Sequence, residues 1–348
     1  MIISSDNKVL QAKKNNSQVV EEITILVEKN DSLKLRPKCL AEYIGQEKLI
    51  AQLSLILNSA KIRNTLPEHI LFYGPPGLGK TTLASLISTE LKCKLKTVTA
   101  TNLQKVGDLV SLLVNLEPNT VLFIDEVHRL RAPLEESLYS AMEDGKVDIL
   151  IGKGQGATTM KIDLEPFVLV GATTQIGKLS KPLRDRFTTI FRLDPYSESD
   201  MLTLVERNTK ILNLKMTDEA KMLICRRSRG VPRIANNILK RFVDLQTVNK
   251  LTEIDRAKAE EFLLKLGIYE KGLTKTDLAY LRALQNGSLS LSSLSAILME
   301  ESETLELVNE PFLIHLGFVE KDSSGRKLTP KGKDFIRNFD DDAVIRLM

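Results

Sequence analysis

Gly74-Pro75-Pro76-Gly77-Leu78-Gly79-Lys80-Thr81-Thr82 is the stretch that decides the fold of this 348-residue chain. It matches the pattern G-x-x-x-x-G-K-[ST], in which glycines let backbone N–H groups point inward at a triphosphate. Lys80 would neutralise β- and γ-phosphate oxygens, and the Thr81 hydroxyl would ligate Mg²⁺. A Gly-rich turn can match by chance. Here an apolar run precedes the motif and a helical pattern follows it, which is the context that a phosphate-binding loop requires.

Short apolar runs alternate with amphipathic segments around this motif. Residues 70–73, 121–124 and 167–170 read as buried strands, and 95–98 and 189–193 are weaker candidates. Residues 81–91 show helical spacing of their leucines and isoleucine. Strands that alternate with helices predict an α/β fold with a parallel sheet covered on both faces.

Composition shifts divide the rest of the chain. Residues 197–266 lack strand-like runs and show helical periodicity, and residues 273–337 predict three helices and a hairpin, the pattern of a winged helix. The expected organisation has five parts, in chain order: a flexible extension (1–33), a nucleotide-binding domain (34–195), a helical domain (196–267), a winged-helix domain (268–337) and a tail (338–348).

Composition excludes several classes of protein. No apolar run approaches the roughly 20 residues that cross a bilayer, and the N-terminus lacks the apolar core of a signal peptide. We therefore expect a cytoplasmic protein that does not bind membranes. The three cysteines lack metal-ligand spacing and only three histidines are present, so a zinc site or a Ser-His-Asp site is disfavoured. The net charge of +4 is compatible with nucleic-acid binding but too small to argue for it.

Two adjacent carboxylates, Asp125 and Glu126, end an apolar run 45 residues after Lys80. In an α/β sheet, this position places Asp125 beside a metal and lets Glu126 polarise an attacking water. His128 could contact the γ-phosphate or be a structural neighbour. Thr174 ends a third predicted strand, where a polar side chain lies near the ligand of such sheets or is simply solvated.

Arginines supply the next candidates. Arg186 lies in Pro182–Phe187 and could stabilise transition-state charge at a neighbour's γ-phosphate, or could belong to a surface charge cluster. Arg233 offers a further guanidinium from the helical domain.

The chain resembles the RuvB family, AAA+ motors that drive branch migration of Holliday junctions in bacteria. The resemblance covers about 34–337 and is carried by these stretches: LRPKCLAEYIGQ (35–46), HILFYGPPGLGKTTLA (69–84), NLEPNTVLFIDEVHRL (115–130), YSAMEDG (139–145), MKIDLEPFVLVGATT (160–174), PLRDRF (182–187) and SRGVPRIANN (228–237). The phosphate-binding loop is shared by many unrelated nucleotidases, whereas the combination of the later stretches is far more specific.

The resemblance implies a role for each matching position. Thr174 would be a sensor, Arg186 a finger acting on the neighbouring subunit, and Arg233 a second sensor. The positions expected to contact ATP are Leu35, Arg36, Ile44, Gly45, Gly77, Gly79, Lys80, Thr81, Thr82, Glu143, Asp144, Gly145, Arg186, Tyr196 and Arg233. Mg²⁺ would lie on Thr81 and Asp125.

Three positions depart from the family pattern. Gly145 replaces an aromatic residue, and Gln175 and Lys321 each replace an arginine. Lys321 keeps the charge but loses bidentate phosphate geometry. Because the motor residues are complete, none of the three puts hydrolysis in doubt.

Residues 147–164 alternate apolar and polar side chains on both sides of a Gly-rich centre, which predicts a long hairpin. It could fold onto its own core. By resemblance, its apolar tip, with Val147, Ile149 and Ile151, would dock the partner protein RuvA.

Residues 318–337 hold six basic and three acidic residues, whereas the preceding helical region carries five glutamates. Phosphates would repel that region, so DNA contact is expected through the wing and the phosphate backbone, without base reading. The resemblance assigns the contact to Lys321 and Arg326. The alternative is a solvated hairpin in a protein-binding winged helix.

These expectations combine into an ATP-driven motor that migrates Holliday junctions in homologous recombination, DNA repair and the SOS response. It would act on duplex DNA at four-way junctions as a homo-oligomeric ring, expected to be a hexamer, with RuvA and the resolvase RuvC. Two alternatives stay open: another AAA+ remodeller such as a clamp-loader subunit, and a nucleotide-switched DNA-binding scaffold without useful turnover.

Overall fold

The computed structural model describes residues 34–151 and 158–339. They fall into two compact units that divide between Asp200 and Met201. The expected N-terminal extension, the glycine-rich hairpin centre 152–156 and residues 340–348 lie outside the described residues.

A five-stranded parallel sheet forms the centre of the first unit, in the order β2-β3-β6-β1-β7. Its strands are β1 (Ile70–Tyr73), β2 (Lys94–Thr99), β3 (Thr120–Asp125), β6 (Phe167–Thr173) and β7 (Thr189–Arg192). All five predicted strands are confirmed. The central strands β3 and β6 are the most buried, which explains their unbroken apolar sequences.

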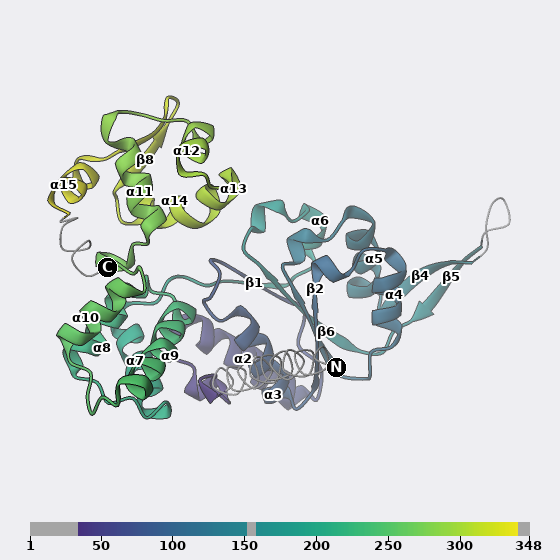
Figure 1. Cartoon of the computed structure of the whole chain (residues 1–348). Helices are drawn as coiled ribbons and strands as arrows, with labels where there is room; N and C mark the ends of the chain where they lie inside the picture. Colours follow the sequence, from purple (N-terminus) through teal and green to yellow (C-terminus); the bar gives the residue numbers. More distant parts are fainter. Residues whose placement is uncertain (1–33, 152–157, 340–348) are drawn as a thin grey trace, which may run out of the picture. The chain divides into compact units, whose positions relative to one another are not determined.

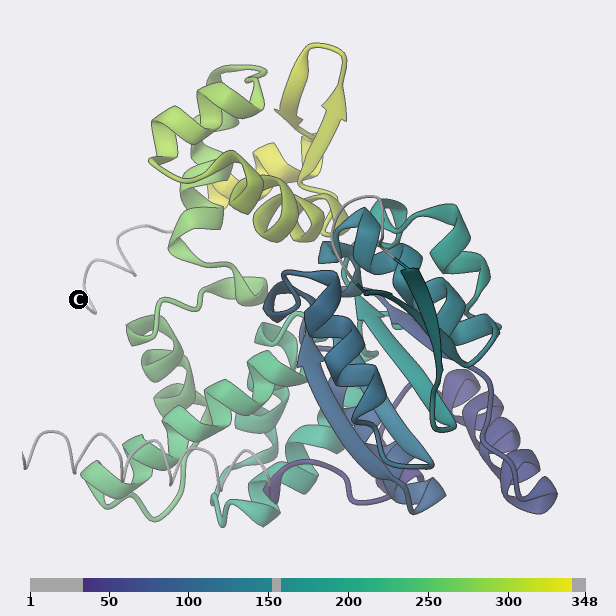
Figure 2. The same ribbon diagram turned by 90° about the vertical axis from the view of Figure 1, so that its right-hand side faces the viewer.

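Helices cover both faces of this sheet (Figures 1 and 2). One face carries α2 (Glu47–Arg63) and α3 (Lys80–Leu91), and the other carries α4 (Val106–Val114), α5 (Ala132–Glu143) and α6 (Lys181–Asp185). Strand alternation divides β3 between them: Leu122 and Ile124 join one core with Leu109 and Leu134, while Phe123 belongs to the opposite face. Short 3₁₀ turns connect the elements: Leu40–Glu42, Ala100–Asn102, Val127–Arg129 and Ile176–Lys178.

The predicted long hairpin is present as a separate two-stranded antiparallel sheet. Its strands β4 (Lys146–Ile151) and β5 (Thr158–Asp163) pair only with each other among the described residues and project from the unit (Figure 1). The hairpin leaves the chain after α5 and returns to it just before β6.

The second unit is helical, apart from a hairpin. Its lid consists of α7 (Glu198–Ile211), which begins at the division between the units, α8 (Asp218–Arg227), α9 (Pro232–Asn249) and α10 (Arg256–Lys265). The winged helix consists of α11 (Lys275–Ala283), α12 (Leu291–Leu298), α13 (Ser302–Thr304), α14 (Glu310–His315), β8 (Val319–Asp322), β9 (Gly325–Leu328) and α15 (Pro330–Asn338), with 3₁₀ turns at Glu270–Gly272 and Leu284–Asn286.

Polar side chains start these helices where the sequence places them. The side-chain oxygens of Thr217, Asp255, Thr274, Ser290 and Thr329 accept a backbone N–H from the first turn of α8, α10, α11, α12 and α15. One difference from the expectation is that a π-helical segment, Leu305–Asn309, interrupts the third helix of the winged-helix pattern before α14. No helix in the part of the chain that the structure describes is long and apolar enough to span a bilayer.

Candidate functional site

The loop between β1 and α3 curls around the ammonium of Lys80. Nζ of Lys80 donates to the carbonyl oxygens of Gly74 (2.8 Å) and Pro75 (2.9 Å), and the residue is only 7% exposed. Gly79 has a φ of 104°, and a Cβ there would lie 2.5 Å from the Tyr43 hydroxyl. Only glycine fits this position. The loop thus holds a buried cation at the N-terminus of a helix, a suitable cradle for a polyphosphate.

Parallel strand order brings the other predicted residues to the same edge. β6 lies between β1 and β3, so Asp125 at the end of β3 and Thr173 at the end of β6 flank the loop that follows β1. Thr81 occupies the second position of α3. Carboxyl ends of parallel strands are where open α/β sheets bind ligands. One hydroxyl and one carboxylate, with phosphate oxygens and water, match the ligands that Mg²⁺ prefers.

Glu126 is held by the neighbouring strand. Its Oε2 accepts the Thr174 hydroxyl (3.1 Å) and the Thr174 backbone N–H (3.3 Å). Nδ1 of His128 lies 3.1 Å from the same oxygen and 2.8 Å from the Thr173 hydroxyl. Glu126 itself has left-handed backbone, with φ 51°, a strained conformation typical of functional positions. The carboxylate predicted to activate water and the predicted sensor are therefore in direct contact.

His128 contacts both the end of β6 and Glu126. Burial lowers the pKa of His128, and the opposing attraction of Glu126 does not reverse the shift. The imidazole is therefore neutral at pH 7. In the neutral form one ring nitrogen carries no proton, so the tautomer decides whether His128 donates to Glu126 or accepts from Thr173.

The segment before the loop supplies a second wall. Tyr43 donates its hydroxyl hydrogen to the Leu78 carbonyl (3.1 Å), and burial together with the nearby Tyr196 raises the pKa of Tyr43. Burial raises the pKa of Tyr196 to about 12, so the phenol is neutral. A Cβ on Gly45 would be 2.9 Å from the Tyr196 ring. The structure thus brings Gly45 and Tyr196, two predicted nucleotide contacts, together beside the phosphate loop.

The remaining positions predicted on this side differ in exposure. Leu35 is 4% exposed, Ile44 is half-buried and Arg36 is exposed. Gln46 donates to the Asp194 carbonyl (2.6 Å), which fastens the segment to the end of the domain. Sequence reasoning missed Tyr43, and its only signal was its place inside a stretch that resembles the family.

Arg186 forms a local ion pair. NH2 donates to Glu143 Oε2 (2.7 Å) and NH1 to the Pro182 carbonyl (3.0 Å), and the guanidinium lies 4.6 Å from the centre of the Tyr139 ring. Among the described residues Nε of Arg186 is buried without a hydrogen-bond partner. The predicted finger and the predicted nucleotide contact Glu143 are therefore bonded to each other within this chain.

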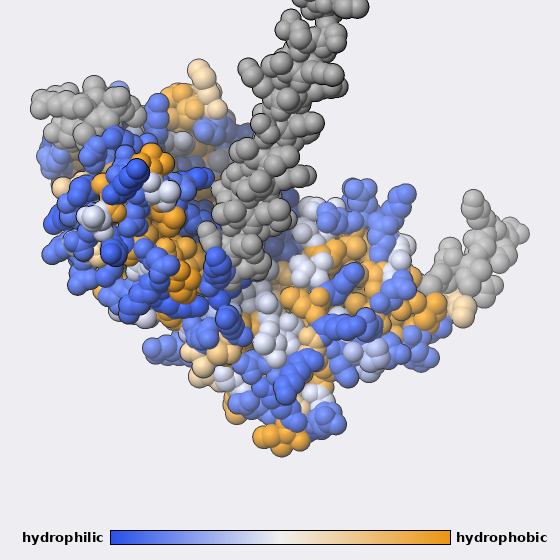
Figure 3. Space-filling model, turned by 60° about the horizontal axis from the view of Figure 1, so that its bottom comes forward, coloured by the Kyte–Doolittle hydropathy of each residue, from blue (hydrophilic) through white to orange (hydrophobic). Residues whose placement is uncertain are grey.

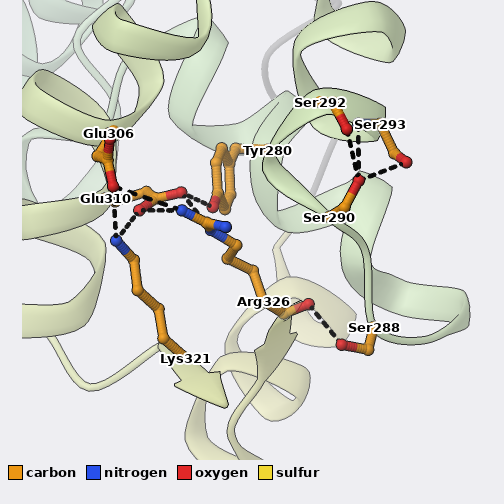
Figure 4. Close-up of polar contacts among 9 residues, drawn as sticks. All are labelled: Tyr280, Ser288, Ser290, Ser292, Ser293, Glu306, Glu310, Lys321 and Arg326. Carbon is orange, nitrogen blue, oxygen red and sulfur yellow. Dashed lines mark hydrogen bonds and ion pairs between the residues drawn. The ribbon is translucent and has the colours of Figure 1, made fainter. Parts of the chain in front are cut away.

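The wing cations converge on one buried carboxylate (Figure 4). Glu310 is 0% exposed, and its Oε1 accepts from Nε of Arg326 (2.8 Å) and from the Tyr280 hydroxyl (2.8 Å). Lys321 pairs with Oε2 of Glu310, and Glu306 lies 3.7 Å from both cations. Burial raises the pKa of Glu310, but the hydrogen bonds from Arg326, Lys321 and Tyr280 outweigh burial and the net shift is downward. Glu310 is therefore ionised.

Three family models cover the described fold almost end to end. The Holliday junction DNA helicase RuvB P-loop domain matches residues 35–193, the RuvB AAA lid domain matches 196–269 and the RuvB C-terminal winged helix domain matches 270–337. The chain belongs to the RuvB family.

Similar proteins extend over nearly the whole length of the chain. The Holliday junction branch migration complex subunit RuvB of Fusobacterium nucleatum is 43% identical over 318 residues, covering 90% of this chain and 96% of the relative. The subunit of the same name from Chloroflexus aggregans is 44% identical over 306 residues, 87% of each chain. The structure of the Thermotoga maritima RuvB Holliday junction branch migration motor matches with a TM-score of 0.79 at 40% identity, covering 88% of this chain and 99% of that one.

The prediction that Val147 helps to dock a partner protein is wrong. Val147 is 0% exposed, so it packs inside the protein and cannot offer a surface. Ile149 and Ile151 lie in β4, opposite Met160 and Thr158, but their side chains lie outside the described residues. Met160 is 50% exposed, and Figure 3 shows hydrophobic surface on the projection next to the grey tip. An exposed apolar surface is therefore present on the hairpin, beyond Val147.

Arg233 lies in the second unit, exposed, in the first turn of α9. Its predicted place at the phosphates of the RuvB-type P-loop domain stays a prediction. Among the other predicted nucleotide contacts, Thr82 lies in the first turn of α3. Asp144 and Gly145 follow α5, and Asp144 is exposed.

Proposed function

We propose that this chain is the ATP-hydrolysing subunit of a branch migration complex and moves duplex DNA at four-way junctions in recombination and repair. Members of the RuvB family are ATP-driven motors of Holliday junction branch migration, and the match extends over all three domains of this chain. The observation that carries the proposal is the nucleotide edge, meaning the carboxyl ends of β3 and β6 and the loop after β1. Lys80, Asp125 and the Glu126–Thr174 pair lie there. A clamp-loader subunit or a passive scaffold is not favoured by these matches.

The residues of the edge divide the work of hydrolysis. Lys80 binds β- and γ-phosphate oxygens, for which it exchanges its present carbonyl partners. Thr81 and Asp125 would hold Mg²⁺, which would supply charge neutralisation for the triphosphate. Glu126 orients the attacking water, and Thr174 fixes the rotamer of that carboxylate from the adjacent strand. Tyr43, Gly45 and Tyr196 form the wall expected to face the base of ATP.

Two arginines, Arg186 and Arg233, would complete the ATP site when the subunits form a ring. Arg186 would leave Glu143 and reach the γ-phosphate of the neighbouring subunit, since half-exposed ion pairs are weak and exchange readily. Arg233 would reach the phosphates of its own subunit. A homo-oligomeric ring, expected to be a hexamer, supplies each site with both.

DNA would be held by the wing through phosphates. Lys321 is the more accessible cation, with 38% of its side chain exposed against 16% for Arg326. A DNA phosphate would replace the half-exposed Glu306 as their outer partner, while the buried Glu310 stays in place. Because phosphates carry no sequence information, the motor could travel over any sequence.

Partners and compartment are proposed on the family resemblance. The tip of the β4–β5 hairpin would dock RuvA, and RuvC would resolve the junction that the motor moves. A cytoplasmic location fits this role.

Dissociation of a synthetic four-way junction tests the proposed function. With ATP, Mg²⁺ and RuvA, the chain should convert the junction to duplex products, and omission of ATP should stop conversion. Phosphate release that proceeds without any junction movement would favour another remodeller. Binding of junctions without phosphate release would favour the scaffold.

Ile149→Asp tests the docking hairpin. A charge in an apolar contact costs binding, so partner-stimulated branch migration should be lost while intrinsic ATP hydrolysis stays within about two-fold. Ile62→Asp is the matched control, because Ile62 is 86% exposed on α2 and away from the hairpin. Calorimetry should show normal RuvA binding for the control only. Equal binding by both variants would place the docking surface elsewhere.

A further inference from the structure

Arg229 connects the lid to the winged helix. It lies in the turn between α8 and α9, four residues before Arg233, with left-handed backbone at φ 56°. Its Nε donates to the Gly272 carbonyl (2.8 Å), its NH2 donates to Asp277 Oδ2 (2.5 Å), and its guanidinium lies 4.1 Å from the centre of the Phe312 ring. Strained backbone persists only where surrounding contacts fix it, and three contacts fix Arg229.

Asp277 carries the connection inward. It is 0% exposed, and its two oxygens serve different partners. Oδ2 receives Arg229 and the capping hydroxyl of Thr274 (2.7 Å), while Oδ1 receives Nδ2 of Asn309 (2.7 Å). Asn309 is itself only 5% exposed. Asp277 is thus a buried carboxylate whose hydrogen bonds join the lid turn, α11 and the π-helical segment.

Glu310, the residue after Asn309, connects this hydrogen-bond network to the wing. Glu310 follows Asn309 directly, and Tyr280, one turn along α11 from Asp277, donates to it. Two parallel hydrogen bonds therefore join α11 to the Asn309–Glu310 step. Glu310 then holds Arg326 and Lys321, as Figure 4 shows. The backbone of Arg326 is also paired with Leu289 in both directions (2.8 and 3.0 Å), which leaves the wing little freedom to turn separately.

We propose that Arg229, Asp277, Asn309 and Glu310 are positioning residues that join the arginine-bearing turn of the lid to the wing. The nucleotide state sensed at Arg233 would thereby set the affinity of the wing for DNA. Fully satisfied buried polar networks are rigid, because each lost bond leaves a desolvated group. Movement of the start of α9 is therefore passed to Lys321 and Arg326 instead of being absorbed at residues 267–272. The proposal rests on the proposed function, which assigns ATP to Arg233 and DNA to the wing.

Arg227 provides the matched control. It is also largely buried, at 5% exposure, and lies two residues earlier. Within the described residues its side chain bonds to Glu260 and to the Ile268 carbonyl, but not to α11, the π-helical segment or the wing. Its loss weakens the lid without cutting the path. A variant that acts through general destabilisation would therefore be matched by Arg227→Gln.

The test measures duplex binding by fluorescence anisotropy in ATPγS and in ADP, using full-length protein with RuvA. The ratio of the two dissociation constants reports coupling, for which values of about 5- to 150-fold are ordinary. Arg229→Gln and Asn309→Ala cut the path at separate points. Both should bring the ratio to within about two-fold of one, while hydrolysis without DNA stays near the wild-type rate. Arg229→Lys, which keeps the charge, should restore part of the ratio and is the second variant if Arg229→Gln does not fold.

Three outcomes would overturn the inference. The first is that both Arg229→Gln and Asn309→Ala keep the ratio of the unmodified protein. The second is that Arg227→Gln loses the ratio to the same extent as they do, and the third is that the unmodified protein itself has a ratio near one. None of these outcomes touches the proposed function, because ATP-dependent junction movement is measured separately and would stand. Failure of wild-type protein to move junctions at all would instead remove the proposed function.

Discussion

The nucleotide edge and the wing are both proposed to bind phosphates through cations, yet the two sites hold those cations differently. At the edge, Lys80 is bonded to backbone carbonyls of its own loop, which carry no net charge. In the wing, Lys321 and Arg326 share the buried carboxylate of Glu310, and Glu306 lies 3.7 Å from both. Lys80 thus lies buried at the start of a helix with carbonyl oxygens among its partners, whereas a phosphate at the wing meets cations that Glu310 and Glu306 already balance. The first arrangement suits tight binding of one ligand, and the second suits repeated release along DNA.

Arg186 is held by a partly exposed ion pair, an arrangement intermediate between the two. Its replacement is expected to have the largest effect, a loss of ATP turnover. Paired with the half-exposed Glu143, it is free to exchange for a neighbour's phosphate. Arg186→Ala and Lys80→Ala should each lose about 10³- to 10⁵-fold in ATP turnover. Mixed, they should recover partial activity, because some interfaces join an intact loop to an intact finger. Steady-state phosphate release across mixing ratios measures this recovery.

A mixture no more active than its separate parts would show that the Glu143 pair is the whole role of Arg186. That conclusion requires a control showing that the two variants co-assemble, for example by pull-down of one tagged variant.

Glu126→Gln tests whether the negative charge of Glu126 is needed for ATP hydrolysis but not for ATP binding. An amide can still accept from the Thr174 hydroxyl, so ATP binding should stay nearly normal. Without a carboxylate to orient water, turnover should fall by about 10²- to 10⁴-fold. Equilibrium binding of a fluorescent ATP analogue and phosphate release separate the two. Lost binding with unchanged residual turnover would contradict the assigned role.

The wing should respond more modestly. Replacing Lys321 and Arg326 together by Ala should weaken binding of unrelated duplexes alike and reduce the salt slope by about one to two units. Lys333→Ala, an exposed charge on α15, is the control. A sequence-dependent loss would argue against phosphate contact.

Separating the two wing residues sharpens the comparison. Arg326→Ala should also destabilise the winged helix by about 2 kcal/mol, less than the 3–5 of an unpaired buried charge, because Lys321 and Tyr280 still serve Glu310. Lys321→Ala should mainly affect DNA. Chemical unfolding measures the difference, and equal destabilisation by both would mean that Lys321 is no freer than Arg326.

The smallest effect concerns pH at the nucleotide edge. Because the pKa of His128 is lowered in the folded protein, the unfolded chain takes up that proton first as pH falls below about 6.5. Stability is therefore full above this pH and declines below it. His128→Gln should flatten the decline in melting temperature between neutral pH and pH 5.5. His69, whose pKa burial also lowers, remains in both proteins, so their difference isolates His128. Parallel melting curves would show that His128 does not contribute.

Much of the nucleotide edge could be predicted because its information is local. Apolar runs define strands whose ends carry the reactive residues, and the motif glycines define the loop between them. The wing shows the limit. Its basic residues were evident, but their partner Glu310 is brought in by the fold from a helix that the sequence marks only as acidic. Val147 shows a similar limit. The alternating pattern predicted its strand correctly, but it did not indicate that this end of the strand is buried.

The separate pairing of the β4–β5 hairpin has a consequence for how such motors diversify. The excursion from α5 to β6 adds no strand to the central sheet, so the register that aligns Glu126 with Thr174 does not depend on it. Substitutions in the hairpin therefore leave the strand order of the central sheet unchanged. If the hairpin docks a partner as we propose, substitutions there would change that partner while the chemistry of the sheet edge is inherited unchanged.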